Sequence, residues 1–250
     1  MNATMSNVPS YDGYRKYTAD VAANYERDRQ VEPMWWKEDE FVREYFRDRV
    51  VPRLLDLPVG TGRFFPHYVG VQQVVGVDVS EDMLAQARSK LALLPAGAAG
   101  SVERGDLFGL RFADGEFTHV VVWRLLHLIP ETLLPAAVAE LCRVTQGEIV
   151  VQTYVSAPAP AVPRRVRLEG QLRRVARALR GAILPAAQNP GAAVAEPGAP
   201  AATPWSHIQS YPHSQARIDA LFLGYGFAAR STRHLDTYDN CDCRVTVYQR

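Results

Sequence analysis

Residues 54–80 read LLDLPVGTGRFFPHYVGVQQVVGVDVS, and this stretch decides the fold. An apolar run ends at Asp56, a glycine turn follows at residues 60–62, and a second apolar run ends at Asp78. The segment after the turn can begin a helix. Strand, glycine turn, helix, strand and acid, in this order, predict the first half of a nucleotide-binding α/β unit. An acid at the end of the second strand can accept the hydroxyl hydrogens of a ribose, so we expect a ligand that contains a nucleoside.

The features missing from this stretch restrict the kind of nucleotide. A dinucleotide fingerprint needs a third glycine where this chain has the bulky Phe65, and no phosphate-binding G-x-x-x-x-G-K-[ST] run occurs. Asp56 directly precedes the turn, where its negative charge would repel a pyrophosphate. The same charge suits a ligand that carries a cationic amino group.

An acid, a glycine pair and a second acid in this spacing resemble the class I S-adenosylmethionine-dependent methyltransferases. Further motifs that carry the resemblance are Asp82-Met83-Leu84, Gly105-Asp106-Leu107, the strand at 117–122 with Trp123 to Pro130 after it, residues 140–144 and 148–151, and the closing segments 224–227 and 243–248. The resemblance covers roughly residues 15–155 and 205–250. One departure is Pro58, where the family usually has glycine. Proline has no N–H to donate, so a backbone contact near the methionine end of the ligand is expected to be lost.

The resemblance implies a Rossmann-like α/β fold: a mostly parallel seven-stranded sheet, helices on both faces, and a closing antiparallel hairpin. It implies S-adenosyl-L-methionine as cofactor, with Asp78 on the ribose, Met83 against the adenine and Asp106 at the adenine amino group. The residues expected to contact the cofactor are Asp56, Pro58, Gly60, Thr61, Gly62, Arg63, Asp78, Val79, Met83, Asp106, Leu107 and Trp123.

Four regions are predicted along the chain. Residues 1–50 are expected to form an N-terminal helical lid and 51–155 the cofactor-binding core. Residues 156–204 form a basic helix followed by an Ala/Pro-rich insertion, and 205–250 return to the same sheet. Strands and helices alternate between Arg53 and Tyr154, which independently predicts a parallel sheet covered on both faces.

The first region carries apolar residues at helical spacing over 41–46, which predicts a helix packed on the sheet edge. A second interpretation is a lid over the cofactor, because tyrosine offers both a ring and a hydroxyl. Tyr17 and Tyr25 are the candidates for this role. The two interpretations are compatible.

Residues 162–183 contain seven arginines and a single acid, with leucines and valine at helical spacing. Three interpretations stay open for this basic helix: a solvated face, recognition of an anionic substrate or lipid headgroup, and nucleic-acid binding. In residues 185–204, fifteen of twenty are Pro, Ala or Gly, which is typical of a loop or linker. Residues 156–214 are interpreted as the substrate-specificity region, with Trp205, His207 and Tyr211 as candidate substrate contacts.

His127 is the candidate catalytic base, because it follows the fourth predicted strand at the mouth of the site. A histidine near neutral pH can take the proton of a hydroxyl acceptor. A half-buried histidine that caps a helix is the competing interpretation. His207 and His213 are secondary candidates, and an amine or carbon acceptor would need no base.

The composition narrows the partners. A net charge of +1 gives no general attraction to nucleic acid, and the motifs of base methyltransferases are missing after the fourth strand. Three cysteines at this spacing predict neither a disulfide framework nor a metal site. With no signal peptide and no transmembrane segment in the sequence, we expect a cytoplasmic protein, and peripheral membrane contact stays compatible with that.

The predicted function is methyl transfer to a small-molecule acceptor: a metabolite, sugar, lipid or quinone-like compound. An anionic or lipid-like acceptor is compatible with this prediction. The alternatives are a non-catalytic subunit of the same fold and a methyltransferase that acts on RNA or protein. A Rossmann oxidoreductase or epimerase is disfavoured by the missing third glycine. The oligomeric state does not follow from the sequence.

Overall fold

The computed structural model describes residues 17–156, 210–238 and 241–250. The basic helix predicted at 162–183, Trp205 and His207 lie outside the described residues. Within the ranges just given, none of the helices combines the length and the apolar character needed to cross a membrane.

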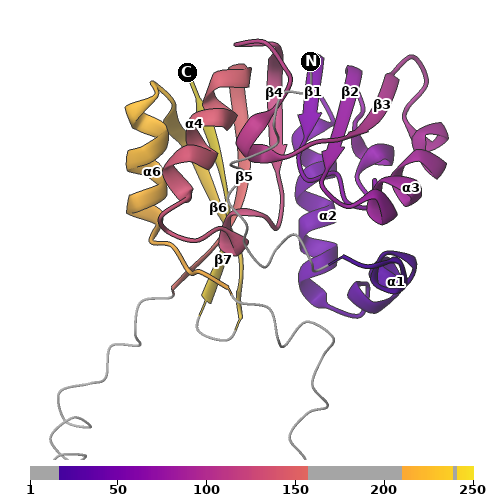
Figure 1. The fold of residues 1–250 in the computed structure, drawn as a ribbon, viewed down its shortest axis with the longest axis horizontal. Helices are drawn as coiled ribbons and strands as arrows, with labels where there is room; N and C mark the ends of the chain where they lie inside the picture. The colour runs from indigo at the N-terminus through magenta and orange to yellow at the C-terminus, as the bar shows by residue number, and fades with distance from the viewer. Residues whose placement is uncertain (1–16, 157–209, 239–240) are drawn as a thin grey trace, which may run out of the picture. The chain divides into compact units, whose positions relative to one another are not determined.

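Seven strands form one sheet in the order β3-β2-β1-β4-β5-β7-β6 (Figure 1). Their bounds are β1 Val51–Asp56, β2 Val71–Asp78, β3 Ala99–Arg104, β4 Phe117–Val122, β5 Thr145–Ser156, β6 Ala228–Tyr238 and β7 Cys241–Gln249. The first five strands are parallel, whereas β7 runs antiparallel to both β5 and β6. The predicted parallel sheet and its closing hairpin are therefore confirmed.

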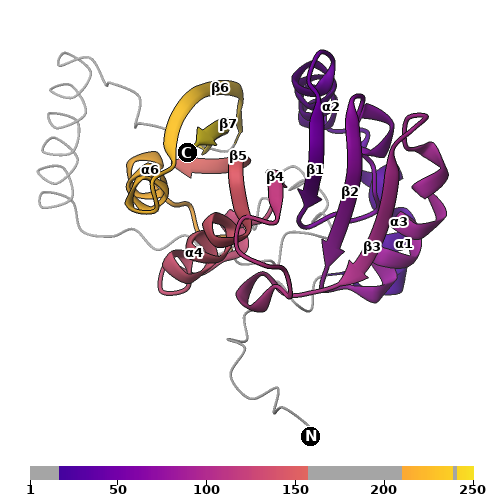
Figure 2. The same cartoon turned by 90° about the horizontal axis from the view of Figure 1, so that it is seen from above.

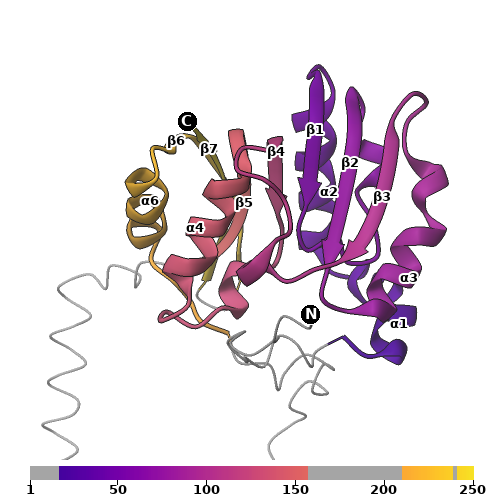
Figure 3. The same ribbon diagram turned by 45° about the horizontal axis from the view of Figure 1, so that its top comes forward.

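The chain order of the strands reverses between β1 and β4, which are neighbours in the sheet. Parallel strands leave a crevice at their carboxyl ends where the connections diverge to opposite faces, and ligands bind there. Asp56 and Asp78 are the last residues of β1 and β2, so both acids lie at this edge. Helix α1 lies at the same end of the sheet (Figure 3).

Helices cover both faces of the sheet (Figure 2). Their bounds are α1 Ala19–Arg29, α2 Pro33–Phe46, α3 Glu81–Ser89, α4 Leu134–Val144 and α6 Gln215–Gly224. One apolar cluster packs α2 and α3 on one face, and a second packs α4 and α6 on the other. The apolar side of α2 faces the sheet, as its spacing predicts.

The segment after the glycine turn differs from the expected helix. It forms only a short 3-10 helix, Phe65–His67, before β2 begins at Val71. Pro66 has no N–H for an α-helical hydrogen bond. Gly70 has φ +77°, and its carbonyl accepts the N–H of Val51, which fixes the start of β1. The connection over residues 57–70 therefore contains a 3-10 helix in place of the expected α-helix, and its Phe65 and Tyr68 are buried.

Candidate functional site

A pocket opens at the carboxyl ends of β1, β2 and β4 and is bordered by the N-terminal segment. Its lining residues are Tyr17, Tyr25, Pro58, Val59, Gly60, Thr61, Arg63, Phe64, Asp78, Met83, Trp123 and Arg124. Seven of the twelve cofactor contacts expected from the sequence line it, together with both candidate tyrosines. The expected contacts that do not line it are Asp56, Gly62, Val79, Asp106 and Leu107. Val59, Phe64 and Arg124 line the pocket although the sequence analysis did not single them out.

The glycine turn forms the floor of this pocket. Gly60 has φ +54° and Gly62 has φ +71°, a backbone region that side chains with a Cβ rarely adopt. A Cβ at Gly62 would lie 2.7 Å from the ring of Phe65, whereas a Cβ at Gly60 would meet no atom within 4 Å. Gly62 is thus needed for internal packing, and Gly60 leaves space on the open side of the turn.

Asp78 lies across from the turn and is almost fully buried. Its Oδ2 accepts the N–H of Gly60 at 3.0 Å, and its Oδ1 accepts the N–H of Ser80 at 2.9 Å. Burial raises the pKa of this carboxyl to about 6, against backbone hydrogen bonds that lower it. Each oxygen keeps a further lone pair, so the carboxylate can still accept two hydroxyl hydrogens from a ligand.

Met83 lies beside Asp78 in the first turn of α3, and its side chain is buried. The hydroxyl of Ser80 caps this helix by accepting the N–H of Met83. A flexible thioether there suits the face of an aromatic base. Asp106 instead accepts the N–H of Phe108 at 2.9 Å and begins a 3-10 turn after β3.

Asp56 lies behind the pocket wall. Its side chain is 1% exposed, and its Oδ2 accepts the hydroxyl of Tyr68 at 2.6 Å. Its Oδ1 is buried and has no hydrogen-bond partner among the described residues. Burial raises the pKa of this carboxyl to about 7, so it is neutral over much of the acidic range.

Helix α1 closes over the turn through polar contacts. Thr61 donates its hydroxyl to Glu26 at 2.5 Å, and Lys90 also pairs with Glu26. The hydroxyl of Ser80 donates to the carbonyl of Tyr17 at 2.9 Å. The rings of Tyr17 and Tyr25 meet edge to face at 5.9 Å. The two tyrosines therefore form a wall of the pocket.

The opposite side of the pocket holds two guanidinium groups, from Arg63 and Arg124. Both pair with Glu38, a fully buried acid of α2 that the sequence analysis did not single out. A signal for it was available, because Glu38 interrupts the apolar side of α2 between Trp35 and Phe41. A charge at such a position predicts a buried partner.

Trp123 also lines the pocket and packs against Phe41 and Phe64. Its indole N–H is buried and has no hydrogen-bond acceptor among the described residues. An indole can only donate, so this group is available to an acceptor atom of a ligand.

His127 lies four residues beyond the pocket-lining Trp123, in a 3-10 turn Leu126–Leu128. Its ring meets the ring of Tyr154 at 4.7 Å, and its carbonyl accepts the N–H of Tyr211 at 2.7 Å. His127 is not among the residues that line the pocket. The candidate substrate contact Tyr211 thus lies next to the candidate base.

His213, one of the secondary candidates, is buried and holds the loop that carries His127. Its Nδ1 lies 2.9 Å from a carboxylate oxygen of Glu131. Its Nε2 lies 2.9 Å from the carbonyl of Ile129 and 3.2 Å from that of Leu126. With both ring nitrogens directed at acceptors, His213 fits a structural role better than a base.

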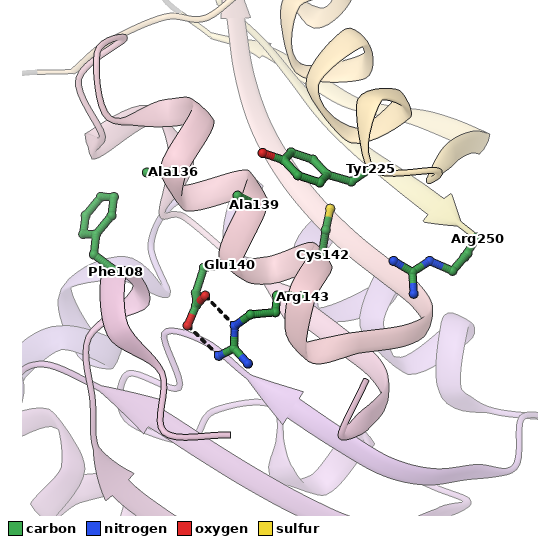
Figure 4. Close-up of a pocket in the computed structure, with 8 residues that line it drawn as sticks. All are labelled: Phe108, Ala136, Ala139, Glu140, Cys142, Arg143, Tyr225 and Arg250. Atoms are coloured by element: carbon green, nitrogen blue, oxygen red, sulfur yellow. Dashed lines mark hydrogen bonds and ion pairs between the residues drawn. The ribbon is translucent and has the colours of Figure 1, made fainter. Parts of the chain in front are cut away.

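A second, larger pocket lies between α4 and α6, away from the glycine turn (Figure 4). It is lined by Phe108, Ala136, Ala139, Glu140, Cys142, Arg143, Tyr225 and Arg250. Arg143 is paired with Glu140 there, at 2.7 Å. None of the site residues expected from the sequence lines this pocket, so the candidate site is the one at the glycine turn.

Comparison with known proteins agrees with this geometry. Residues 54–147 match the model of a family described as a methyltransferase domain, a span that includes the glycine turn, Asp78 and the loop after β4. Over these residues the chain is similar to a methyltransferase domain.

Two relatives and one solved structure illustrate the likeness. A phosphatidylethanolamine N-methyltransferase of Cereibacter sphaeroides is 32% identical over 126 residues, which cover 48% of this chain and 61% of that protein. A demethylmenaquinone methyltransferase of Desulfitobacterium hafniense is 36% identical over 92 residues, 36% of each chain. The chain thus spans less than two thirds of the length of both relatives.

The solved structure shares the fold along nearly the whole chain. It is magnesium protoporphyrin IX methyltransferase from Synechocystis PCC 6803 with bound S-adenosylmethionine, with a TM-score of 0.61 and 15% identity. The match covers 95% of this chain and 94% of that one. At 15% identity the similarity shows a shared fold and nothing further.

Proposed function

We propose that this protein transfers the methyl group of S-adenosylmethionine to a small-molecule acceptor. The observation that carries the proposal is the Asp78 carboxylate, which Gly60 and Ser80 hold beside the glycine turn. A buried carboxylate at the end of β2 suits two adjacent hydroxyls, as on a ribose. The match to a methyltransferase domain over the same residues supports it.

The residues around the pocket fit this cofactor along its length. Met83 offers an apolar surface for the adenine beside Asp78, and Gly60 leaves open space where a Cβ would stand. Pro58 lines the pocket in place of the usual glycine and can donate no N–H. The remaining donors on that side are the indole of Trp123 and the guanidinium groups of Arg63 and Arg124.

S-adenosylmethionine, when bound, supplies an electrophilic methyl group on its sulfonium. The chain's own part is to bind an acceptor, exclude water and align the attacking atom with the bond that breaks. Helix α1 and the residues just before it serve as the lid in this proposal, since Tyr17 and Tyr25 wall the pocket, whereas α2 packs on the sheet. His127 is the proposed base for a hydroxyl acceptor, and an amine acceptor that binds unprotonated would not require it.

For the acceptor we propose a small molecule of lipid or quinone type. The two relatives are named for phosphatidylethanolamine and demethylmenaquinone, which are both poorly soluble in water. Val31 in the turn between α1 and α2 is 82% exposed, and Trp36 near the start of α2 is 58% exposed. An apolar surface at this place suits an amphiphilic substrate. Trp205, His207 and the arginines of 164–180 are proposed to contribute to acceptor recognition.

The test has two stages. Calorimetric titration with S-adenosylhomocysteine should show saturable binding to the wild type and a loss of at least tenfold in Asp78→Ala. Transfer of a labelled methyl group from S-adenosylmethionine should then be measured on phosphatidylethanolamine vesicles, a demethylated quinone, and a mixture of water-soluble metabolites. Cofactor binding without transfer to any acceptor would favour a non-catalytic subunit, and no binding at all would refute the proposal.

A further inference from the structure

One carboxylate joins α2 to the candidate site. Glu38 is 0% exposed, and its two oxygens accept hydrogen bonds from Arg63, Arg124 and Gln152. Arg63 Nη1 donates at 2.9 Å, Arg124 donates through both Nε and Nη2 at 2.8 Å, and Gln152 Nε2 donates at 2.6 Å. We call these four residues the Glu38 cluster.

The members of the Glu38 cluster come from four separate parts of the chain. Arg63 follows β1, Arg124 follows β4, and Gln152 lies in β5. These three strands are consecutive in the sheet. Glu38 therefore ties the N-terminal helix α2 to the ends of three neighbouring strands, at the edge where the pocket opens.

The backbone of Arg124 is held in an unusual conformation by the same cluster. Its φ is +53°, and among the described residues it is the one non-glycine residue in this region. Such a conformation costs free energy and persists where surrounding contacts fix it. The N–H of Arg124 donates to Gln152 Oε1 at 2.9 Å, while the other end of the same amide donates to Glu38. Backbone and side chain of Arg124 are thus fixed together.

Glu38 is the acid that balances the positive charges of Arg63 and Arg124 at close range. The Arg63 guanidinium lies 3.5 Å from the centre of the Trp35 ring, and burial lowers the pKa of Arg63 although Glu38 raises it. Further acids lie at the rim: Arg124 Nη2 is 3.7 Å from Glu32, and Arg63 Nη2 is 3.8 Å from Asp39. Arg63 Nη2 also donates to the carbonyl of Trp35 at 2.9 Å, but that group carries no charge. Without Glu38 these distant acids would be the nearest described carboxylates to the two cations, and the buried ion pairs would be broken.

We propose that Glu38 is a positioning residue of the cofactor pocket. It holds the guanidinium groups of Arg63 and Arg124, and through them the loop after β4, in the arrangement that receives the amino-acid end of the ligand. This inference rests on the proposed function, which makes that ligand S-adenosylmethionine. Asp78 lies at the end of β2 and Arg124 beyond β4, on either side of β1, so the nucleoside end is remote from the cluster.

The test compares two ligands on Glu38→Gln. S-adenosylhomocysteine carries the amino-acid end, whereas methylthioadenosine carries the nucleoside and a thioether without it. In calorimetry, Glu38→Gln should lower the affinity for S-adenosylhomocysteine at least tenfold. The affinity for methylthioadenosine should stay within about twofold of the wild-type value. Glu40→Gln is the matched control, because Glu40 is an exposed acid of the same helix and should change neither affinity.

Hydrogen exchange in the ligand-free protein gives a second readout that does not depend on the proposed function. The amides of residues 123–125 should exchange faster in Glu38→Gln than in the wild type, because the contacts that fix Arg124 are lost. The inference is overturned if the exchange of these amides is unchanged. It is also overturned if the affinities for both ligands fall equally, because a general structural role of Glu38 predicts that result. If the wild type binds no S-adenosylhomocysteine, the proposed function fails and the exchange measurement alone decides.

Glu38→Asp covers the case in which Glu38→Gln does not fold. It keeps the charge and retracts the carboxylate by one methylene, so the two guanidinium groups can no longer both be reached at the same distances. A selective loss of S-adenosylhomocysteine affinity in this variant supports the positioning role, and wild-type affinity overturns it.

Discussion

Replacing Asp56 by asparagine should change how the stability of the protein depends on pH. Burial raises the pKa of the Asp56 carboxyl from 3.8 to about 7, against the Tyr68 hydrogen bond, which lowers it. The unfolded chain releases this proton near pH 4. Between about pH 4 and pH 7 the native state therefore holds a proton that the unfolded state has lost, and the wild-type free energy of unfolding falls as the pH rises.

The size of this fall follows from the two pKa values. One pKa unit corresponds to about 1.36 kcal/mol, so the rise from 3.8 to about 7 corresponds to a loss on the order of 4 kcal/mol by pH 8. Asparagine cannot ionise, so the Asp56→Asn variant lacks this pH-dependent fall in the free energy of unfolding. Its amide oxygen can still accept the Tyr68 hydroxyl, while its NH₂ replaces a buried oxygen without a described partner. That replacement costs about 1–3 kcal/mol at every pH.

Urea denaturation of both proteins at pH 4.5 and at pH 8 separates the two effects. At pH 4.5 Asp56→Asn should have the lower free energy of unfolding. At pH 8 the difference between the variant and the wild type should have shifted in favour of the variant by several kcal/mol. Acids that do not interact with Asp56 are present in both proteins and cancel in the comparison. A stability difference that is the same at both pH values would refute the reasoning.

Tyr68→Phe is the control for the Asp56 prediction. It removes the one hydrogen bond that lowers the pKa of the Asp56 carboxyl, so the fall in stability should extend to higher pH. A fall that moves to lower pH instead would show that burial does not set this pKa.

Four further predictions concern the pocket and its loop. Asp78→Ala should weaken S-adenosylhomocysteine at least tenfold, because it removes charge-assisted hydrogen bonds of roughly 1.5–3 kcal/mol each, whereas the exposed Asp82→Ala should not. Wild-type affinity should rise with pH through about 6, as the Asp78 carboxyl ionises, and a flat profile would contradict this. His127→Ala should lower kcat by roughly 10²–10⁴ if the acceptor is a hydroxyl, and full activity would indicate an acceptor that needs no base. His213→Ala should lower the free energy of unfolding by about 1–3 kcal/mol, because carbonyls and Glu131 lose their donor, and an unchanged urea midpoint would oppose that role.

The sheet and the position of Asp56 and Asp78 at one edge of it could be predicted because their signals are local. The apolar runs that end at Asp56 and Asp78 define buried parallel strands, and parallel strands bring their carboxyl ends to one edge. The helix expected after the glycine turn was wrong, because Pro66 lies in the connection and only a 3-10 turn forms there. Whether a turn continues into a helix depends on packing and length as well as on its first residues.

The Glu38 cluster could not be predicted as a cluster, because its contacts join residues far apart in the sequence. Glu38 is 25 residues from Arg63, 86 from Arg124 and 114 from Gln152. The break in the apolar side of α2 signals only that an acid is buried. Its partners depend on the order of the strands, which local patterns do not specify. His213 is a similar case, since its role comes from a loop more than 80 residues away.

The left-handed conformation of Arg124 links its evolution to that of another position. The backbone at residue 124 would be relaxed by glycine, whereas the buried charge of Glu38 requires a cation there. The two demands conflict only while residue 38 is acidic. Among homologous chains, glycine or asparagine at the equivalent of 124 should therefore accompany an uncharged residue at the equivalent of 38. Arginine should persist where the acid does, so the two positions should vary as a pair.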